Sequence, residues 1–269
     1  MIRILLTFMV LNFYLKVPHG VSSPIDEKYK EPNNISDKCS SDINHSEDQS
    51  DANALFNQGL KHYGQQDFTK AKECFERAAE NDHAEALYKI GSMFEKGQGV
   101  EQSIFEAREW YERAADEDHP EALYKIGFMY EQGLSCEKDL FDANQCYEEA
   151  ADKGHPGAYW RLGLINRKGL MGETDLTKAR NYFKKGAELG HTEAMVELGF
   201  MCDVGQGGEQ DFFEAKEYYE KAAELGHTDA MFHLSIMYKM GNGVEKDLSK
   251  AREYEENANR LWNLSFEKL

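Results

Sequence analysis

The sequence predicts an all-α protein, a right-handed superhelical α/α solenoid of about six helix-turn-helix repeats. Three observations predict this fold: a 36-residue repeat, two apolar stripes of helical spacing in each repeat, and helix start and stop signals between the stripes. The repeat is seen most plainly in five histidines spaced 36 residues apart, at His83, His119, His155, His191 and His227. No insertion shifts this register, and a period of this length is typical of solenoids that stack paired helices.

Each repeat contains two amphipathic segments. In the repeat that begins at His83, Ala86, Ile90 and Phe94 follow one another at intervals of four residues, which places them on one side of a helix. The second half repeats this pattern with aromatic and small side chains, at Phe105, Ala107, Tyr111, Ala114 and Ala115. We call the first segment of each repeat helix A and the second helix B.

Local signals mark the ends of these helices. Residues that favour the N-cap precede helix B in every such repeat, at Ser103, Asp139, Asp175, Asp211 and Asp247. Glu106 and Glu214 stand three residues further on, as capping-box partners. Gly154, Gly190 and Gly226 suit a left-handed C′ position, and Pro120 and Pro156 suit the first turn of helix A.

A glycine also recurs inside helix A, at Gly91, Gly127, Gly163 and Gly199, with Ser235 at the next repeat. Glycine inside a helix is destabilising by about 0.5 to 1 kcal/mol relative to alanine. Its recurrence predicts a close approach of two helix backbones.

Composition excludes two classes of ligand. The chain has 269 residues, a formal charge of -18 and a pI near 4.9. Nucleic-acid binding depends on Lys and Arg that neutralise phosphates, so a nucleic-acid ligand is excluded. The acidic balance also opposes docking on an anionic membrane surface, and no segment after the N-terminus has the run of apolar residues that a membrane span needs.

The N-terminal part differs from the repeats. Arg3 precedes an apolar run at residues 4–15, which predicts a signal peptide at 1–22, cleaved near Ser22. An uncleaved anchor or a buried helix is the alternative. Residues 23–51 are polar and acidic, which predicts a flexible tail. The solenoid is then expected at 52–260 and a C-terminal cap at 261–269, in a protein that is secreted or held in the secretory-pathway lumen, or in the periplasm or extracellular space of a bacterium.

Three sequons for N-glycosylation occur, at Asn34, Asn44 and Asn263. They predict a glycoprotein only if the host is a eukaryote or its virus.

The repeat resembles a known family. The motif A-x-A-L-Y-x-I-G-x-M-[FY]-E-x-G, with E-x-A-A closing helix B, is similar to the Sel-one-like repeat, a relative of the tetratricopeptide repeat, and covers roughly Ala54 to Ala258. The first repeat departs from the motif because Gly59 and Ala71 are 12 residues apart, whereas Gly91 and Ala107 are 16 apart. It therefore resembles an ordinary tetratricopeptide hairpin. In the last repeat Glu255 replaces the usual aromatic, which fits a terminal cap.

The histidines do not predict a metal site. Successive repeats are separated by about 10 Å, roughly one helix diameter, which is too far for one ion with bonds near 2 Å. We predict that each histidine is a polar residue at the start of helix A, and that the protein has neither a metal nor a cofactor.

Five cysteines occur, at Cys39, Cys74, Cys136, Cys146 and Cys202, and their pairing is left open. Cys74, Cys146 and Cys202 occupy positions where other repeats have aromatic residues, which favours apolar filling. Cys136 and Cys146 share one repeat and are candidates for a bridge. A cysteine-rich bacterial branch of the family, for which penicillin binding has been claimed, has paired cysteines in every repeat. Their absence here favours a protein that is not an enzyme and leaves β-lactam hydrolysis a remote alternative.

The candidate binding residues lie on helix A. The resemblance implies that helix A lines the concave surface of the solenoid. There, position 92 and its equivalents are Ser92, Phe128, Leu164, Phe200 and Ile236, and position 89 and its equivalents are Lys89, Lys125, Arg161, Glu197 and His233. One interpretation is an apolar ridge flanked by bases, which suits a helix or extended peptide with acidic residues. The other is that position 92 packs between neighbouring repeats. The candidate partner-binding residues are Lys89, Lys125, Phe128, Arg161, Leu164, Phe200 and Ile236.

These observations favour a non-enzymatic scaffold or adaptor that binds a protein partner in the secretory pathway or extracellular space. The alternative is a secreted bacterial or viral factor that binds host proteins. The sequence leaves the partner and the oligomeric state open.

Overall fold

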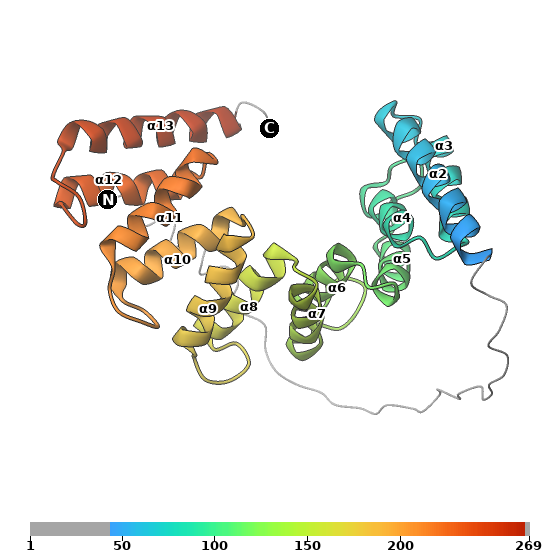
Figure 1. Cartoon of the computed structure of the whole chain (residues 1–269), viewed down its shortest axis with the longest axis horizontal. Helices are drawn as coiled ribbons and strands as arrows, with labels where there is room; N and C mark the ends of the chain where they lie inside the picture. The colour runs from blue at the N-terminus through green and yellow to red at the C-terminus, as the bar shows by residue number, and fades with distance from the viewer. Residues whose placement is uncertain (1–43, 267–269) are drawn as a thin grey trace. The chain divides into compact units, whose positions relative to one another are not determined.

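The protein forms successive pairs of helices (Figure 1) in a computed structural model that describes residues 44–266. Within that range there are twelve helices and no strand. The helices A are α2 (Asn44–Gly64), α4 (Ala84–Lys96), α6 (Pro120–Gln132), α8 (Pro156–Lys168), α10 (Thr192–Val204) and α12 (Thr228–Met240). The helices B are α3 (Phe68–Ala79), α5 (Ile104–Asp116), α7 (Leu140–Asp152), α9 (Leu176–Glu188), α11 (Phe212–Glu224) and α13 (Leu248–Phe266).

Each helix packs against the helix before it and the helix after it, both within a pair and between pairs. The all-α solenoid of six helix-turn-helix units predicted from the repeat is therefore confirmed. The short first connection is confirmed as well, because residues 65–67 join α2 to α3 whereas residues 97–103 join α4 to α5.

The two ends of the solenoid differ from the sequence-based boundaries. Helix α2 begins at Asn44, so residues 44–51 of the segment expected to be a flexible tail are helical. Helix α13 continues through residue 261 to Phe266, so the expected separate cap is the last part of a helix B. The predicted signal peptide at 1–22, Asn34 and Cys39 lie outside the described residues.

The histidine side chain caps helix A at four of the five repeat boundaries marked by a histidine. In four repeats its ring Nδ1 accepts a hydrogen bond from the backbone N–H three residues further on, which is one of the unpaired donors at a helix start. The N–N distances are 3.2 Å at His83 and His119, 3.1 Å at His155 and 3.3 Å at His191. The prediction that these residues occupy the N-terminus of helix A is confirmed.

The same imidazoles join neighbouring repeats. Each capping ring stacks on an aromatic ring of the preceding helix A, with centroid distances of 4.7 Å for Phe56–His83, 4.7 Å for Tyr88–His119, 4.4 Å for Tyr124–His155 and 5.4 Å for Trp160–His191. The His155 Nε2 also lies 2.7 Å from Glu121 Oε2, and this hydrogen bond holds the pKa of Glu121 below its usual range. One side chain thus caps its own helix and contacts the previous repeat.

Helix B starts and stops where its local signals place it. The side chains of Ser103, Asp139, Asp175, Asp211 and Asp247 all accept hydrogen bonds from the first turn of helix B. After α9, Gly190 has φ of +86°, the left-handed conformation expected at C′. Glu214 was expected to complete a capping box, but its carboxylate pairs with Arg180 at 3.1 Å.

The helical glycines face buried aromatic rings. A Cβ added at Gly91 would lie 2.7 Å from the Tyr111 ring, and one at Gly163 would lie 2.5 Å from the Phe183 ring. The same contact pairs Gly59 with Phe75, Gly127 with Tyr147, and Gly199 with Tyr219. Each missing side chain leaves room for the ring of its own helix B, so the close approach predicted from the glycines is confirmed.

Substitution of Gly127 by alanine should destabilise the solenoid. The new Cβ would lie 2.8 Å from the Tyr147 ring, and overpacking of this kind costs about 1 to 3 kcal/mol, more than the gain of about 0.5 to 1 kcal/mol in helix propensity. We expect urea unfolding to show a net loss of about 1 to 2 kcal/mol. At Gly64 an added Cβ meets nothing within 4 Å, so Gly64→Ala is the control. Equal effects of both substitutions would contradict the packing role.

His191 should make the stability of the solenoid depend on pH. Burial lowers the pKa of His191, so the unfolded chain binds more protons than the folded chain. The contribution of His191 is complete above the ordinary imidazole pKa of about 6.5 and is lost as the pH falls below it. His191→Asn keeps a capping oxygen that does not titrate. Unfolding midpoints at neutral and mildly acidic pH should therefore differ less in this variant than in the wild type, and an unchanged difference would refute the assignment.

Candidate protein-binding face

One side of each helix A from α4 to α12 is only partly covered by the stack. In α4 this side carries the exposed Glu85 and Lys96, the half-buried Lys89 and the buried Ser92, whereas Ala86, Leu87, Ile90 and Met93 on the other sides are all buried. Residues spaced by three and four positions share one side of a helix. We call the surface formed by positions 85, 89, 92 and 96 and their equivalents in α6, α8, α10 and α12 the helix A face.

The predicted apolar ridge at position 92 changes in exposure along the helix A face. Ser92 is buried, Phe128, Leu164 and Phe200 are half-buried, and Ile236 is 53% exposed. The position therefore packs partly between neighbouring repeats and becomes exposed toward the C-terminal end.

The bases that flank this ridge are held by the preceding repeat. Lys125 Nζ lies 3.0 Å from both carboxylate oxygens of Glu95. Arg161 donates to Glu131 Oε1 at 3.3 Å, and its guanidinium lies 5.3 Å from the centre of the Phe128 ring. Lys89 lies 5.7 Å from the Tyr88 ring. The predicted bases are thus on the helix A face, but Lys125 and Arg161 have carboxylate partners within the chain.

The paired carboxylates also bind the buried aromatic residues. Tyr111 donates its hydroxyl hydrogen to Glu95 at 2.6 Å, and Tyr147 donates to Glu131 at 2.6 Å. Burial and these neighbours raise the pKa of both tyrosines. A continuous polar chain therefore runs from the ring of helix B, through an acid at position 95 or its equivalent, to a base in the next helix A.

The charges are reversed in the fourth repeat. There the buried ring is Phe183, which has no hydroxyl, and Arg167 takes the place of the acid. The Arg167 guanidinium lies 5.8 Å from the centre of the Phe183 ring and donates to Glu197 Oε1 at 3.0 Å. Burial raises the pKa of Glu197 although Arg167 binds it.

The last two repeats have different residues at the positions of this polar chain. His233 stacks on Tyr219 with ring centres 4.6 Å apart, and burial lowers the pKa of this imidazole. In the final repeat Ser235 replaces the glycine and Glu255 replaces the ring, and the equivalent polar residue, Lys239, forms an ion pair with Glu255.

Sequence reasoning missed Glu95, Glu131 and Arg167. A usable signal exists, because each ion pair joins residues 30 positions apart and the two charges change sign together at Arg167 and Glu197. Comparison of position 95 with position 125 and their equivalents would have shown it.

The four cysteines within residues 44–266 are not paired with one another. Cys74, Cys136, Cys146 and Cys202 are free thiols, so the bridge considered between Cys136 and Cys146 is wrong. Cys136 Sγ instead lies 3.5 Å from the Leu134 carbonyl oxygen. Burial raises the pKa of Cys146 to about 11 and that of Cys202 to about 12. Both remain neutral thiols, which are weak nucleophiles.

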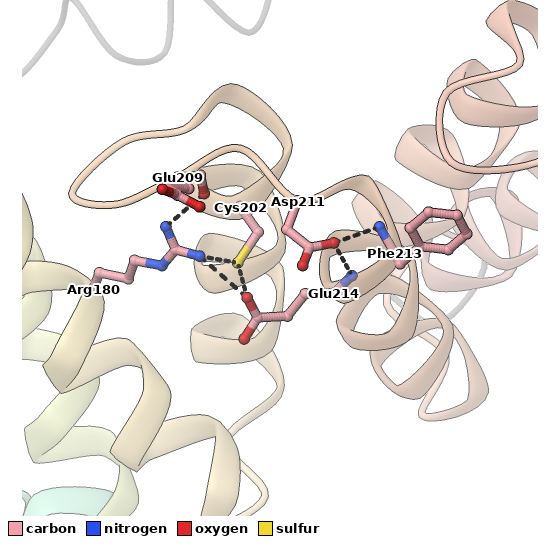
Figure 2. Close-up of polar contacts among 6 residues, drawn as sticks. All are labelled: Arg180, Cys202, Glu209, Asp211, Phe213 and Glu214. Carbon is pink, nitrogen blue, oxygen red and sulfur yellow. Dashed lines mark hydrogen bonds and ion pairs between the residues drawn. The ribbon is translucent and has the colours of Figure 1, made fainter.

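Cys202 belongs to a contact between repeats (Figure 2). Arg180 extends from α9 and donates to Cys202 Sγ and to Glu214 Oε2, both at 3.1 Å, and to the Glu209 carbonyl oxygen at 3.1 Å. Phe213 points away from this cluster and its side chain is 72% exposed. The cluster therefore ties α9 to the loop and start of the next helix B.

The residues 44–266 contain no group of three or more His, Cys, Asp or Glu side chains placed to hold a metal ion. Nor is any helix in this described range both long and apolar enough to cross a membrane.

The fold and its uncovered face define an α/α solenoid of the tetratricopeptide-like class. A family model for the tetratricopeptide repeat matches residues 52–84, in the hairpin with the short loop. The Sel1 repeat model matches five consecutive segments, at residues 84–119, 120–155, 156–191, 192–227 and 228–257. The chain belongs to the Sel1 repeat family, as its motif indicated.

Solved structures show the same fold. A protective antigen of uropathogenic Escherichia coli with an SLR fold is 28% identical, with a TM-score of 0.72 over 81% of this chain and 49% of the antigen. This chain thus spans about half of that protein. A Sel1 repeat protein from Oxalobacter formigenes is 28% identical, with a TM-score of 0.71 over 76% of this chain and 84% of that protein. Comparison with curated proteins gives no match.

Exchange of the charges at Arg167 and Glu197 tests the ion pairs of the helix A face. Both side chains are 23% exposed, so each single reversal should leave two like charges in a partly buried site and lower the unfolding free energy. The double variant R167E/E197R should recover part of the loss, with a coupling energy of about 1 kcal/mol in a double-mutant cycle. Strictly additive effects would show that the pair contributes nothing to the stack.

Proposed function

We propose that this protein is a non-catalytic scaffold that binds a protein or peptide on the helix A face, in the secretory-pathway lumen or the extracellular space. One observation carries the proposal. The buried sides of the helices A repeat the same residue types from unit to unit, whereas position 89 changes from a half-buried Lys in α4 to a half-buried His in α12, and position 92 changes from a buried Ser to an exposed Ile. Only the buried sides of the helices are needed to hold the repeats together. A surface whose residues differ from repeat to repeat is therefore suited to one particular partner.

The chemistry of the described residues supports binding over catalysis. The thiols of Cys146 and Cys202 are neutral and engaged in packing, and the imidazoles of His83, His119, His155 and His191 are used as helix caps. Repeat solenoids of this family bind other proteins.

The setting rests on the N-terminal sequence. The apolar run at residues 4–15 and its small-residue cleavage site support export. Of the sequons, Asn263 is exposed on α13 and Asn44 begins α2. The likeness to the E. coli protective antigen favours the second candidate, a secreted bacterial factor that binds host proteins.

Alanine substitution of two half-buried phenylalanines tests the binding face. Phe128→Ala and Phe200→Ala remove apolar contact area from the helix A face, and partners captured from the native secretome should lose about tenfold in affinity. Affinity is measured by titration of the captured partner against each purified variant.

Phe213→Ala is the matched control, because Phe213 lies on helix B and is 72% exposed. Partner binding should survive this change, and circular dichroism should show all three variants folded. If the solenoid melts in the Phe128 and Phe200 variants, those rings belong to the core. If affinity is unchanged, the face is not the binding site.

A further inference from the structure

The last two helices A expose an apolar patch that the rest of the helix A face lacks. Val204 is 46% exposed, Ile236 53% and Met240 70%, and the half-buried Phe200 adjoins them. Phe200 and Val204 are four residues apart on α10, and Ile236 and Met240 are four residues apart on α12, so each pair occupies one side of its helix. The Phe200 and His233 rings, 6.2 Å apart, bring α10 and α12 together on this face. We call Phe200, Val204, Ile236 and Met240 the C-terminal patch.

The surroundings of the C-terminal patch are acidic. Helices α10 and α12 carry four carboxylates, at Glu193, Glu197, Asp203 and Asp229, and a single lysine, Lys239. Arg167 binds Glu197, and Glu255 binds Lys239. The carboxylates outside these two pairs are Glu193, which lies 3.4 Å from His191 Nδ1, Asp229, and the half-buried Asp203. The Glu193 side chain is 54% exposed, and Asp229 is exposed.

The neighbouring helix limits where such a partner binds. Helix α8 carries Arg161, Arg167 and Lys168 and no carboxylate. Arg161 and Arg167 are paired with Glu131 and Glu197, so Lys168 is the base of α8 that lies outside these ion pairs, whereas α10 and α12 carry Glu193 and Asp229. A basic segment would be opposed by Lys168 at the end of α8 and attracted by the carboxylates of α10 and α12, because like charges across an interface oppose binding.

From this charge pattern and the exposed apolar side chains, we infer that the C-terminal patch binds a basic amphipathic helix of a partner protein. Its apolar side chains would pack on Ile236 and Met240, and its Lys or Arg side chains would face Glu193 and Asp229. The inference rests on the proposed function and gives the partner's chemistry at one end of the same face. It differs from the acidic peptide that the flanking bases suggested, because Lys125 and Arg161 already have carboxylate partners.

Synthetic peptides test the inference directly. The probes are a basic amphipathic helix of Leu and Lys about 18 residues long, an acidic counterpart of Leu and Glu, and a scrambled basic peptide of the same composition without an apolar side. Fluorescence anisotropy with the full chain should show tighter binding of the basic amphipathic peptide than of either other peptide. Its affinity should fall as salt is raised.

Two charge substitutions of equal exposure locate the site. Met240→Glu should weaken the basic amphipathic peptide by about tenfold, because it places an unpaired charge in the apolar contact. Phe213→Glu on α11 makes the same change at a side chain that is 72% exposed, compared with 70% for Met240. The control should bind the peptide as the wild type does, and circular dichroism should show both variants folded.

The inference is overturned if the acidic peptide binds as tightly as the basic one, if the scrambled peptide matches the amphipathic one, or if the Met240 and Phe213 variants lose equal affinity. The proposed function is tested separately with the captured partner. A partner that is lost with Phe128→Ala but retained with Met240→Glu would uphold the proposed function and refute the C-terminal patch as its docking site.

Discussion

A glycine in helix A faces a buried aromatic ring of helix B in five of the six pairs, and this contact sets how the two helices pack. The ring occupies the space that any side chain on the glycine would need, so helix A and helix B approach closely. In the last pair both partners change together, to Ser235 and Glu255. The small residue of helix A and the ring of helix B therefore form one packing unit.

In the second, third and fourth repeats the type of ring in this packing unit corresponds to the sign of the charge beside it. Where the ring is a tyrosine with a hydroxyl to donate, as at Tyr111 and Tyr147, the neighbouring surface residue is a glutamate. Where the ring is Phe183, the residue is Arg167, whose guanidinium packs over the ring face. The next repeat supplies the opposite charge. The loss of the hydroxyl at Phe183 is therefore accompanied by a reversal of both charges of the ion pair.

The reversal divides the helix A face into two parts. Ion pairs run from acid to base between α4 and α8, and from base to acid between α8 and α10. Beyond that boundary the face is acidic and its apolar side chains are exposed at Ile236 and Met240. One stack of repeats therefore presents two chemically different surfaces, which a partner with a single charge sign would distinguish.

The candidate binding residues were only partly predictable. Repeat spacing placed Lys125, Phe128 and Arg161 on helix A, where they lie. It did not show that both bases are paired, because Glu95 and Glu131 are 30 residues away in sequence and become neighbours only when repeats stack. The bridge considered between Cys136 and Cys146 failed for a similar reason, since sharing a repeat does not bring two thiols together.

The sequence by itself determined the period, the all-α class, the helix starts and the glycine contacts. These depend on local rules, such as the capping by His155 and Asp211, that act within one repeat and recur in most of the repeats. Only the tertiary structure decided which charges pair and which apolar side chains stay exposed. Ser92 is buried and Ile236 is 53% exposed at the same repeat position. The difference depends on the side chains that neighbouring repeats place against this position. Those contacts form only in the folded stack.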